Sequence, residues 1–269
     1  MTELPFLYEL ITYLITGVFA GITAGLLGIG GGLLIVPVLS TVFLLFLNTE
    51  SIVHLAIGTS LATILVTSFA SVKAHHKHNA VRWDIVKLMA GGVLLGAFVG
   101  GWSAQFFAST RLSQIFGIIE LAVGIHMLLG IKTSPYRHLP GLVGNSVAGT
   151  VIGCLSSIIG IGGGTLNTPY LQWNNISIHQ AIATSAALSL PIALAGTLGY
   201  LIAGLEADDL PEYATGYIYW PAFFGIVLAS YFTAPIGAKW AHQLPIHYLK
   251  RFFGLFLIIL ALKMLFFSA

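Results

Sequence analysis

The chain has 269 residues, of which 57% are hydrophobic and only 7% are charged. Soluble domains carry about 25% charged residues, so this composition excludes a soluble globular protein and indicates an integral protein of the lipid bilayer. The formal net charge of +2 gives no reason to expect a nucleic-acid partner, and one cysteine, Cys154, excludes an internal disulfide.

Long apolar stretches predict helical membrane spans in the first half of the chain. Residues 10–47 would form a helix about 57 Å long, too long for one crossing, so we predict a hairpin with its turn at 28–32. The spans that follow are expected at 51–72, 85–108 and 112–131. The run from His75 to His78 is interpreted as a solvated loop rather than a metal site. Residues 1–9 lack a basic side chain, so we expect no signal peptide.

The second half repeats this organisation after a connector near residues 132–140. Residues 142–173 form a second interrupted segment. Three more spans are expected at about 178–204, 217–238 and 247–267. The sequence therefore predicts one membrane domain made of two repeats, residues 1–140 and 141–269.

Matching residues support the duplication. The glycines and proline of the first break, Gly28, Gly30, Gly31, Gly32 and Pro37, recur at the same spacing as Gly160, Gly162, Gly163, Gly164 and Pro169. Downstream, the stretch from His54 to Ser60 aligns with His179 to Ser185, and Trp83 aligns with Trp220. Paired glycine and proline breaks in two halves of a membrane protein point to the binding site of a transporter.

Charge decides the expected topology. If each broken segment returns to its starting side, the second repeat is inverted, and most Lys and Arg residues fall on one side, as expected for the cytoplasm. The loop 205–216, with four acidic residues, is then periplasmic. The competing arrangement, in which each segment crosses once, weakens this bias. We predict an all-α membrane fold of two inverted repeats, each a glycine-rich re-entrant hairpin plus three transmembrane helices, because the arm 164–173 is too short to cross.

The hairpin tips offer backbone chemistry for an anion. The second arm of each hairpin starts at its tip, where free N–H groups and the positive end of the helix dipole attract negative charge. The alternative is that the glycines only allow helices to pack closely. On the first view, Gly31→Ala and Gly163→Ala impair anion binding more than Gly92→Ala, since Gly92 sits in an ordinary span where alanine should be tolerated.

The doubled glycine motif, each copy ending in proline, resembles the TauE/SafE family of sulfite and organosulfonate exporters. The Gly58-Thr-Ser60 and Thr184-Ser185 elements fit the same pattern. The resemblance covers both halves and implies a secondary carrier of sulfite or small sulfur-containing organic anions in a bacterial inner membrane. It fixes neither the substrate nor the direction of transport.

Small polar residues near the breaks are candidates for binding such an anion. Hydroxyl and amide donors can bind a sulfonate without a buried cation, although Ser and Thr also form helix–helix hydrogen bonds in membranes. The candidates beside the tip glycines are Thr59, Ser60, Ser156, Ser157, Thr165, Asn167, Thr184 and Ser185. In the first hairpin, Leu33 and Ile35 stand where the second has Thr165 and Asn167.

Few ionisable residues lie at membrane depth. Glu120 is the acidic residue deepest inside a predicted span, which makes it a candidate for a coupling proton, with helix packing as the alternative. We interpret Cys154 as a small packing residue, with a thiol that handles reactive sulfur as the alternative. Packing or capping is the expected role of His54 and His179.

These features predict a secondary anion transporter rather than an enzyme, with no cofactor and no metal. The two halves would rock around an anion held at the hairpin tips. An anion channel, or an intramembrane metal or redox enzyme, is the alternative; the enzyme would need His, Asp or Glu clustered at membrane depth. The coupling ion and the oligomeric state, a homodimer included, stay open.

Overall fold

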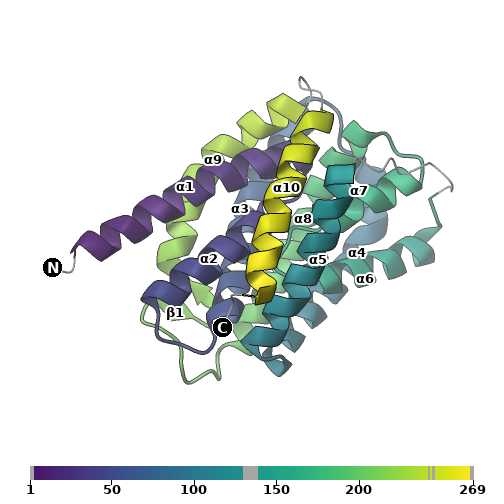
Figure 1. The fold of residues 1–269 in the computed structure, drawn as a ribbon. Helices are drawn as coiled ribbons and strands as arrows, with labels where there is room; N and C mark the ends of the chain where they lie inside the picture. Colours follow the sequence, from purple (N-terminus) through teal and green to yellow (C-terminus); the bar gives the residue numbers. More distant parts are fainter. Residues whose placement is uncertain (1–2, 130–138, 242, 244–245, 267–269) are drawn as a thin grey trace.

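The structure is a computed structural model that describes residues 3–129, 139–241, 243 and 246–266. In these residues the chain forms ten α-helices, one short 3-10 helix and one two-stranded β-hairpin (Figure 1). Six of the helices are long and apolar enough to cross a membrane, which confirms the predicted all-α membrane fold. The elements are α1 (Glu3–Leu27), α2 (Gly32–Phe46), α3 (Ile52–Lys77), α4 (Trp83–Ser103), η1 (Ala104–Phe106), α5 (Ser109–Leu129), α6 (Leu142–Ile158), α7 (Gly164–Trp173), α8 (Ile178–Ala203), β1 (Ala214–Thr215), β2 (Ile218–Tyr219), α9 (Trp220–Ala241) and α10 (Ile246–Phe266).

Both glycine clusters break the helices where the sequence predicts. We call α1 and α2 the first hairpin, with residues 28–31 as its tip, and α6 and α7 the second hairpin, with residues 159–163 as its tip. The residue before each second arm is left-handed, with φ 86° at Gly31 and φ 60° at Gly163. This conformation is strained for residues with a Cβ, so glycine defines where each arm restarts. At 10 residues, α7 is too short to cross the hydrocarbon layer.

Glycines also set the distance between long helices. The first hairpin packs on α9 through Gly17, Gly21 and Gly25, and α6 packs on α4 through Gly92, Gly96 and Gly100. The backbones touch at these points, as is common where small residues recur every four positions in membrane helices. A Cβ at Gly92 would collide with the carbonyl oxygen of Ser146. The prediction that alanine is tolerated at Gly92 is therefore wrong.

The helices α3 and α8 run antiparallel through the middle of the molecule. At one end, Tyr217 before β2 packs on the ring of His54 in the first turn of α3, and its N–H donates to the carbonyl of Tyr200 near the end of α8. At the other end, the N–H of Arg82, just after α3, donates to Thr184 near the start of α8. The α3 helix is enclosed along most of its length, which makes it the central element of the fold.

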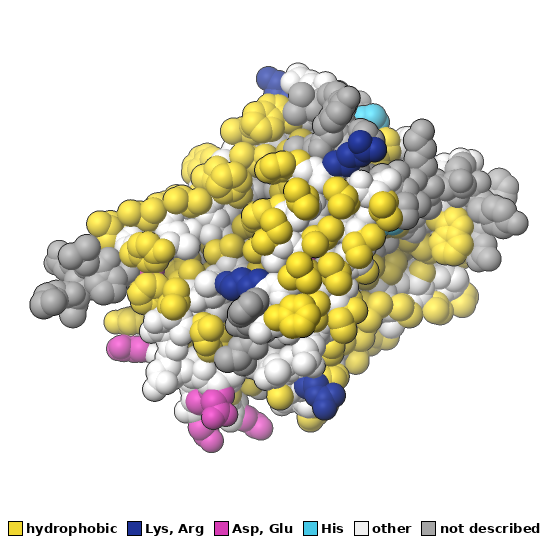
Figure 2. Space-filling model, viewed as in Figure 1, with side chains coloured by type: hydrophobic (Ala, Val, Ile, Leu, Met, Phe, Trp, Pro, Cys, Tyr) yellow, Lys and Arg dark blue, Asp and Glu magenta, His cyan; other side chains and the backbone are white. Residues whose placement is uncertain are grey.

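Opposite charges gather at opposite ends of α3. Asp209, from the loop after α8, accepts hydrogen bonds from Thr49 and Ser51 just before α3, and Figure 2 shows acidic side chains clustered at this end. Lys77 and Lys239 line one cavity at the other end, so they lie at the same end of the molecule. The side of the membrane that each end faces stays a prediction.

Two local features differ from the sequence-based expectation. The α3 helix continues to Lys77, and His75 is buried with its Nε2 3.0 Å from the carbonyl oxygen of Gly25, so the prediction of a solvated loop is wrong for His75. Residues 214–219, part of which was expected in a span, form a β-hairpin before α9. The connector residues 130–138 lie outside the described part of the chain.

Candidate functional site

The two hairpin tips meet inside the molecule, backbone against backbone. An added Cβ at Gly30 would lie 3.0 Å from the Cα of Gly162, and a Cβ at Gly162 would lie 3.0 Å from the Cα of Gly30. A Cβ at Gly32 would collide with the carbonyl of Gly160, and one at Gly164 with the carbonyl of Gly28. The two tips therefore come together, and their glycines allow the backbones to pack closely.

Serines from the central helices hold the second tip. Ser60 of α3 donates a hydrogen bond to the carbonyl of Gly160 at 2.9 Å. Ser189 of α8 donates to the carbonyl of Gly162, and Thr168 of α7 donates to the hydroxyl of Ser185 at 3.0 Å. Sequence reasoning missed Ser189, although it lies one helical turn after Ser185 and on the same face of α8.

Thr59 and Thr184 are turned toward neighbouring helix ends rather than toward the tips. The hydroxyl of Thr59 accepts the N–H of Tyr219 at 2.9 Å, just before α9 begins. The hydroxyl of Thr184 accepts the N–H of Arg82 at 3.1 Å, just before α4 begins. Both hydroxyls thus satisfy N–H groups at the start of a helix, which would otherwise lack a partner.

Unpartnered polar groups gather in the second hairpin and on the helices around it. Ser156, Ser157 and Asn167 are fully buried, and their side-chain oxygens and the Asn167 amide nitrogen find no hydrogen-bond partner in the described structure. A buried polar group without a partner costs about 1–3 kcal/mol. Such groups call for an explanation, and binding of an ion is one of them.

Ser157 and Asn167 face the same side of α8. A Cβ at Gly196 of α8 would lie 2.6 Å from the hydroxyl oxygen of Ser157. One turn earlier, Ile192 of α8 packs at Gly163, where a Cβ would also lie 2.8 Å from the amide nitrogen of Asn167. The Asn167 side chain therefore lies beside the N-terminus of α7, where backbone N–H groups and the helix dipole favour an anion.

The opposite face of the α7 N-terminus opens onto a cavity of about 340 Å³. Its walls include Leu27 and Ile29 at the first tip, Gly164 and Thr165 at the start of α7, and His126 of α5. The hydroxyl of Thr165 has no hydrogen-bond partner in the described structure. The start of α7 is thus bordered by unpartnered polar groups on both faces.

Glu120 lies elsewhere, on the buried face of α5. It is fully buried, and neither carboxylate oxygen has a hydrogen-bond partner among the described residues. On the same helix, Gly117 and Gly124 contact α10, whereas the residues that α5 contributes to the 340 Å³ cavity do not include Glu120. The structure therefore does not bring this carboxyl to the hairpin tips.

The histidines and the cysteine have packing contacts. His54 lies 3.2 Å from both the Ser109 hydroxyl and the Ala104 carbonyl, as a packing role predicts. The backbone of Cys154 lies against Gly100, and Cys154 forms no disulfide. Within the described residues, no group of three or more His, Cys, Asp or Glu side chains is placed to hold a metal ion.

Residues 13–264 match the family described as "Sulfite exporter TauE/SafE". A probable membrane transporter protein of Haemophilus influenzae is 37% identical over 257 residues, which cover 93% of this chain and 96% of that protein. A probable membrane transporter protein of Methanocaldococcus jannaschii is 28% identical, covering 87% of this chain and 85% of its own. The probable membrane transporter protein YunE of Bacillus subtilis is 27% identical, with 83% and 85% covered. No solved structure matches. The match spans both hairpins and the helices between and after them, and the chain belongs to the sulfite exporter TauE/SafE family.

Proposed function

We propose that this multi-pass membrane protein is a secondary transporter that binds sulfite or a small sulfonate at the second hairpin. The family description supports a small anion as the substrate, and the names of the relatives support transport across a membrane. The observation that carries the location is that two side chains are buried and unpartnered: Asn167 in the first turn of α7, and Ser157 near the end of α6, beside Gly196 of α8. An oxyanion accepts several hydrogen bonds at once, so it would satisfy donors that the protein leaves unpaired.

Contacts that recur between matching positions of the two halves support an inverted repeat. The tip residue Gly28 lies against Ile182 of α8, and Gly160 lies against Ile57 of α3, its aligned counterpart. The hydrogen bonds of Thr59 and Thr184 are related in the same way, because Arg82 and Tyr219 precede the aligned Trp83 and Trp220. Because α3 and α8 are antiparallel, these matching contacts favour a second repeat that is inverted relative to the first.

This arrangement suits alternating access around a central site. Each hairpin packs on a helix of the other half, α1 on α9 and α6 on α4, while the tips touch each other. Rocking of one half against the other would open the tip region first to one side and then to the other. In a bacterial inner membrane, the positive end of α3 would lie on the cytoplasmic side, and the acidic loop after α8 would lie on the periplasmic side.

Binding to purified protein in detergent tests the proposal. Calorimetric titration with sulfite, thiosulfate, taurine, sulfoacetate and sulfolactate identifies the anion. We expect Asn167→Ala and Ser157→Ala to weaken its binding at least tenfold, since a hydrogen bond to a charged group contributes about 1.5–3 kcal/mol. The matched control is Ser40→Ala, because Ser40 is also buried and unpartnered but lies on α2. Equal binding in parent and all three variants would refute the site.

Transport measurements separate a carrier from a channel. In proteoliposomes, a carrier shows flux that saturates with substrate and exchanges labelled for unlabelled anion across the membrane. Flux that stays proportional to concentration, without exchange, would favour the channel.

A further inference from the structure

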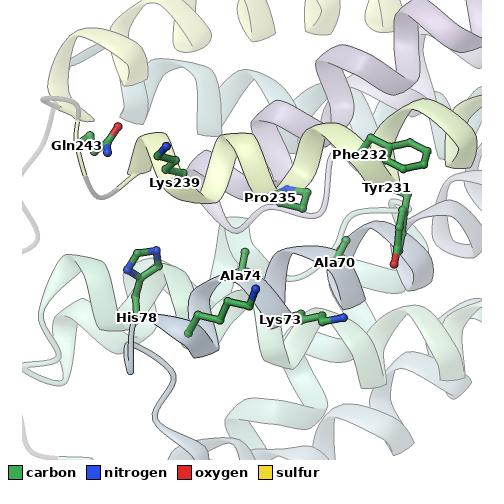
Figure 3. A pocket seen from close by; sticks show the side chains of 10 residues that line it. Ala70, Lys73, Ala74, His78, Tyr231, Phe232, Pro235, Lys239 and Gln243 are labelled. Carbon is green, nitrogen blue, oxygen red and sulfur yellow. The ribbon is translucent and has the colours of Figure 1, made fainter.

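A second cavity, distinct from the hairpin site, lies between α3 and α9 at the positive end of α3 (Figure 3). Its volume is about 640 Å³. Three lysines, Lys73, Lys77 and Lys239, line it together with His78 and Gln243, and no carboxylate is among the described lining residues. The charged side chains among the described lining residues are therefore all positive.

The rest of the lining is mainly apolar, and two of its aromatic side chains are exposed. Ala70 and Ala74 of α3 and Pro235 of α9 line its middle, and Tyr231 and Phe232 lie at one end. Phe232 is 67% exposed and Tyr231 40% exposed, on a helix that is otherwise a membrane span. In Figure 3, Lys239 and His78 lie at one end of the groove, and Lys73 extends toward Tyr231.

The dimensions and the composition favour an amphiphile over a free inorganic anion. The groove runs from Lys239 to Tyr231, about 12 Å along α9 at 1.5 Å per residue, from the end of the span toward its middle. Its volume is roughly twenty times the ~30 Å³ share of one water molecule, so a sulfite-sized ion would leave most of it unfilled. Lysines at the interface with an apolar, lipid-facing wall beneath them are the features of a site for an anionic lipid head group.

We propose that this groove binds an anionic phospholipid, with the phosphate among the lysines and the upper part of an acyl chain along Ala70, Pro235 and Phe232. A lipid held there would bridge α3, the central helix, and α9, which packs on the first hairpin. The site is independent of the anion site in the second hairpin, because it shares no residue with it.

Native mass spectrometry of the purified full-length protein tests this proposal. The protein is titrated with phosphatidylglycerol and with phosphatidylcholine, and thermal shift is measured in parallel. We expect phosphatidylglycerol to bind and to raise Tm, while phosphatidylcholine does neither. In the double variant Lys73→Gln/Lys239→Gln, phosphatidylglycerol binding should weaken roughly 30-fold, given the contribution of each lysine near anionic lipid.

Lys87→Gln is the matched control. Lys87 is an exposed lysine near the start of α4, at the same end of the molecule, and it does not line the groove. Binding that falls equally in Lys87→Gln and in the double variant would overturn the proposal, because it would reflect net charge alone. In a second titration, inorganic phosphate replaces the lipid. If phosphate raises Tm as much as phosphatidylglycerol does, and both increases are lost in the double variant, the groove is a site for free anions and the lipid assignment is wrong.

Discussion

Replacing Gly163 by alanine separates anion binding from hairpin packing. Gly163 has φ 60°, which costs a residue with a Cβ about 1–2 kcal/mol. Its Cβ would also press on the side chain of Ile192 and lie 2.8 Å from the Asn167 amide nitrogen. The Asn167 side chain must therefore move, and we expect the site to lose its hydrogen bond to the anion.

The expected loss of affinity follows from that bond. A hydrogen bond to a charged group contributes about 1.5–3 kcal/mol, so Gly163→Ala should weaken anion binding by roughly 10- to 100-fold. Gly31→Ala introduces the same strain at φ 86°, and its Cβ would lie 2.8 Å from the carbonyl oxygen of Ala20. That neighbour is backbone of α1 and no polar side chain of the site is displaced. Gly31→Ala should therefore lower Tm with a smaller effect on affinity.

The control is Gly91→Ala on α4. An added Cβ at Gly91 meets no atom within 4 Å, whereas the adjacent Gly92 is closely packed and unsuitable. Alanine in a helix interior is favoured over glycine by about 1 kcal/mol, so Gly91→Ala should keep or raise Tm. The assay is calorimetric affinity measured on the folded fraction, with Tm recorded for each variant. If folded Gly163→Ala protein binds the anion as the parent does, the reasoning about Asn167 and the α7 N-terminus fails.

Three further predictions concern charge. Partial burial raises the pKa of Asp209, but hydrogen bonds from the segment before α3 outweigh this effect and hold the pKa below its usual range. Asp209→Asn should therefore lower Tm at pH 7. The difference in Tm from the parent should vanish as the pH falls through the depressed pKa of Asp209. Glu120→Gln should abolish the pH dependence of transport in proteoliposomes while leaving anion binding intact, and an unchanged pH profile would make Glu120 a packing residue. Cysteines placed at Lys77 and Lys239 should react with an impermeant reagent from the same side of the membrane. A cysteine placed at Glu206 should react from the opposite side. Labelling of the two lysine positions from different sides would contradict the fold.

The sequence predicts the breaks and spans well because both have local causes. Glycine clusters destabilise a helix wherever they occur. The length of an apolar stretch shows whether a helix can cross the hydrocarbon layer. The helix ends at Leu27 and Ile158 and the restarts at Gly32 and Gly164 fall where the repeated motif places them. The β-hairpin at 214–219 was not predicted, because two-residue strands leave no periodic pattern.

The side-chain roles are harder to predict because they depend on contacts distant in the chain. The sequence gives no reason to assign different roles to the adjacent hydroxyl residues Thr59 and Ser60, or to Thr184 and Ser185. In the structure, the two threonines accept hydrogen bonds from N–H groups before other helices, whereas Ser60 donates to the second tip. Gly92 was mistaken for a tolerant position although a sequence signal existed. It recurs with Gly96 and Gly100 at intervals of four, the spacing of close helix packing.

The two hairpins differ in polarity although their glycine motifs match. Thr165 and Asn167 of the second arm are matched by Leu33 and Ile35 in the first, and both of the latter are buried. The first tip therefore also ends in a left-handed glycine before its second arm, but it has no polar side chain at these positions to complete an anion site. The two tips touch through Gly30 and Gly162, so a movement of the apolar hairpin would act on the polar one through backbone contact. We infer that the second hairpin binds the anion and that the first forms the wall against which it moves.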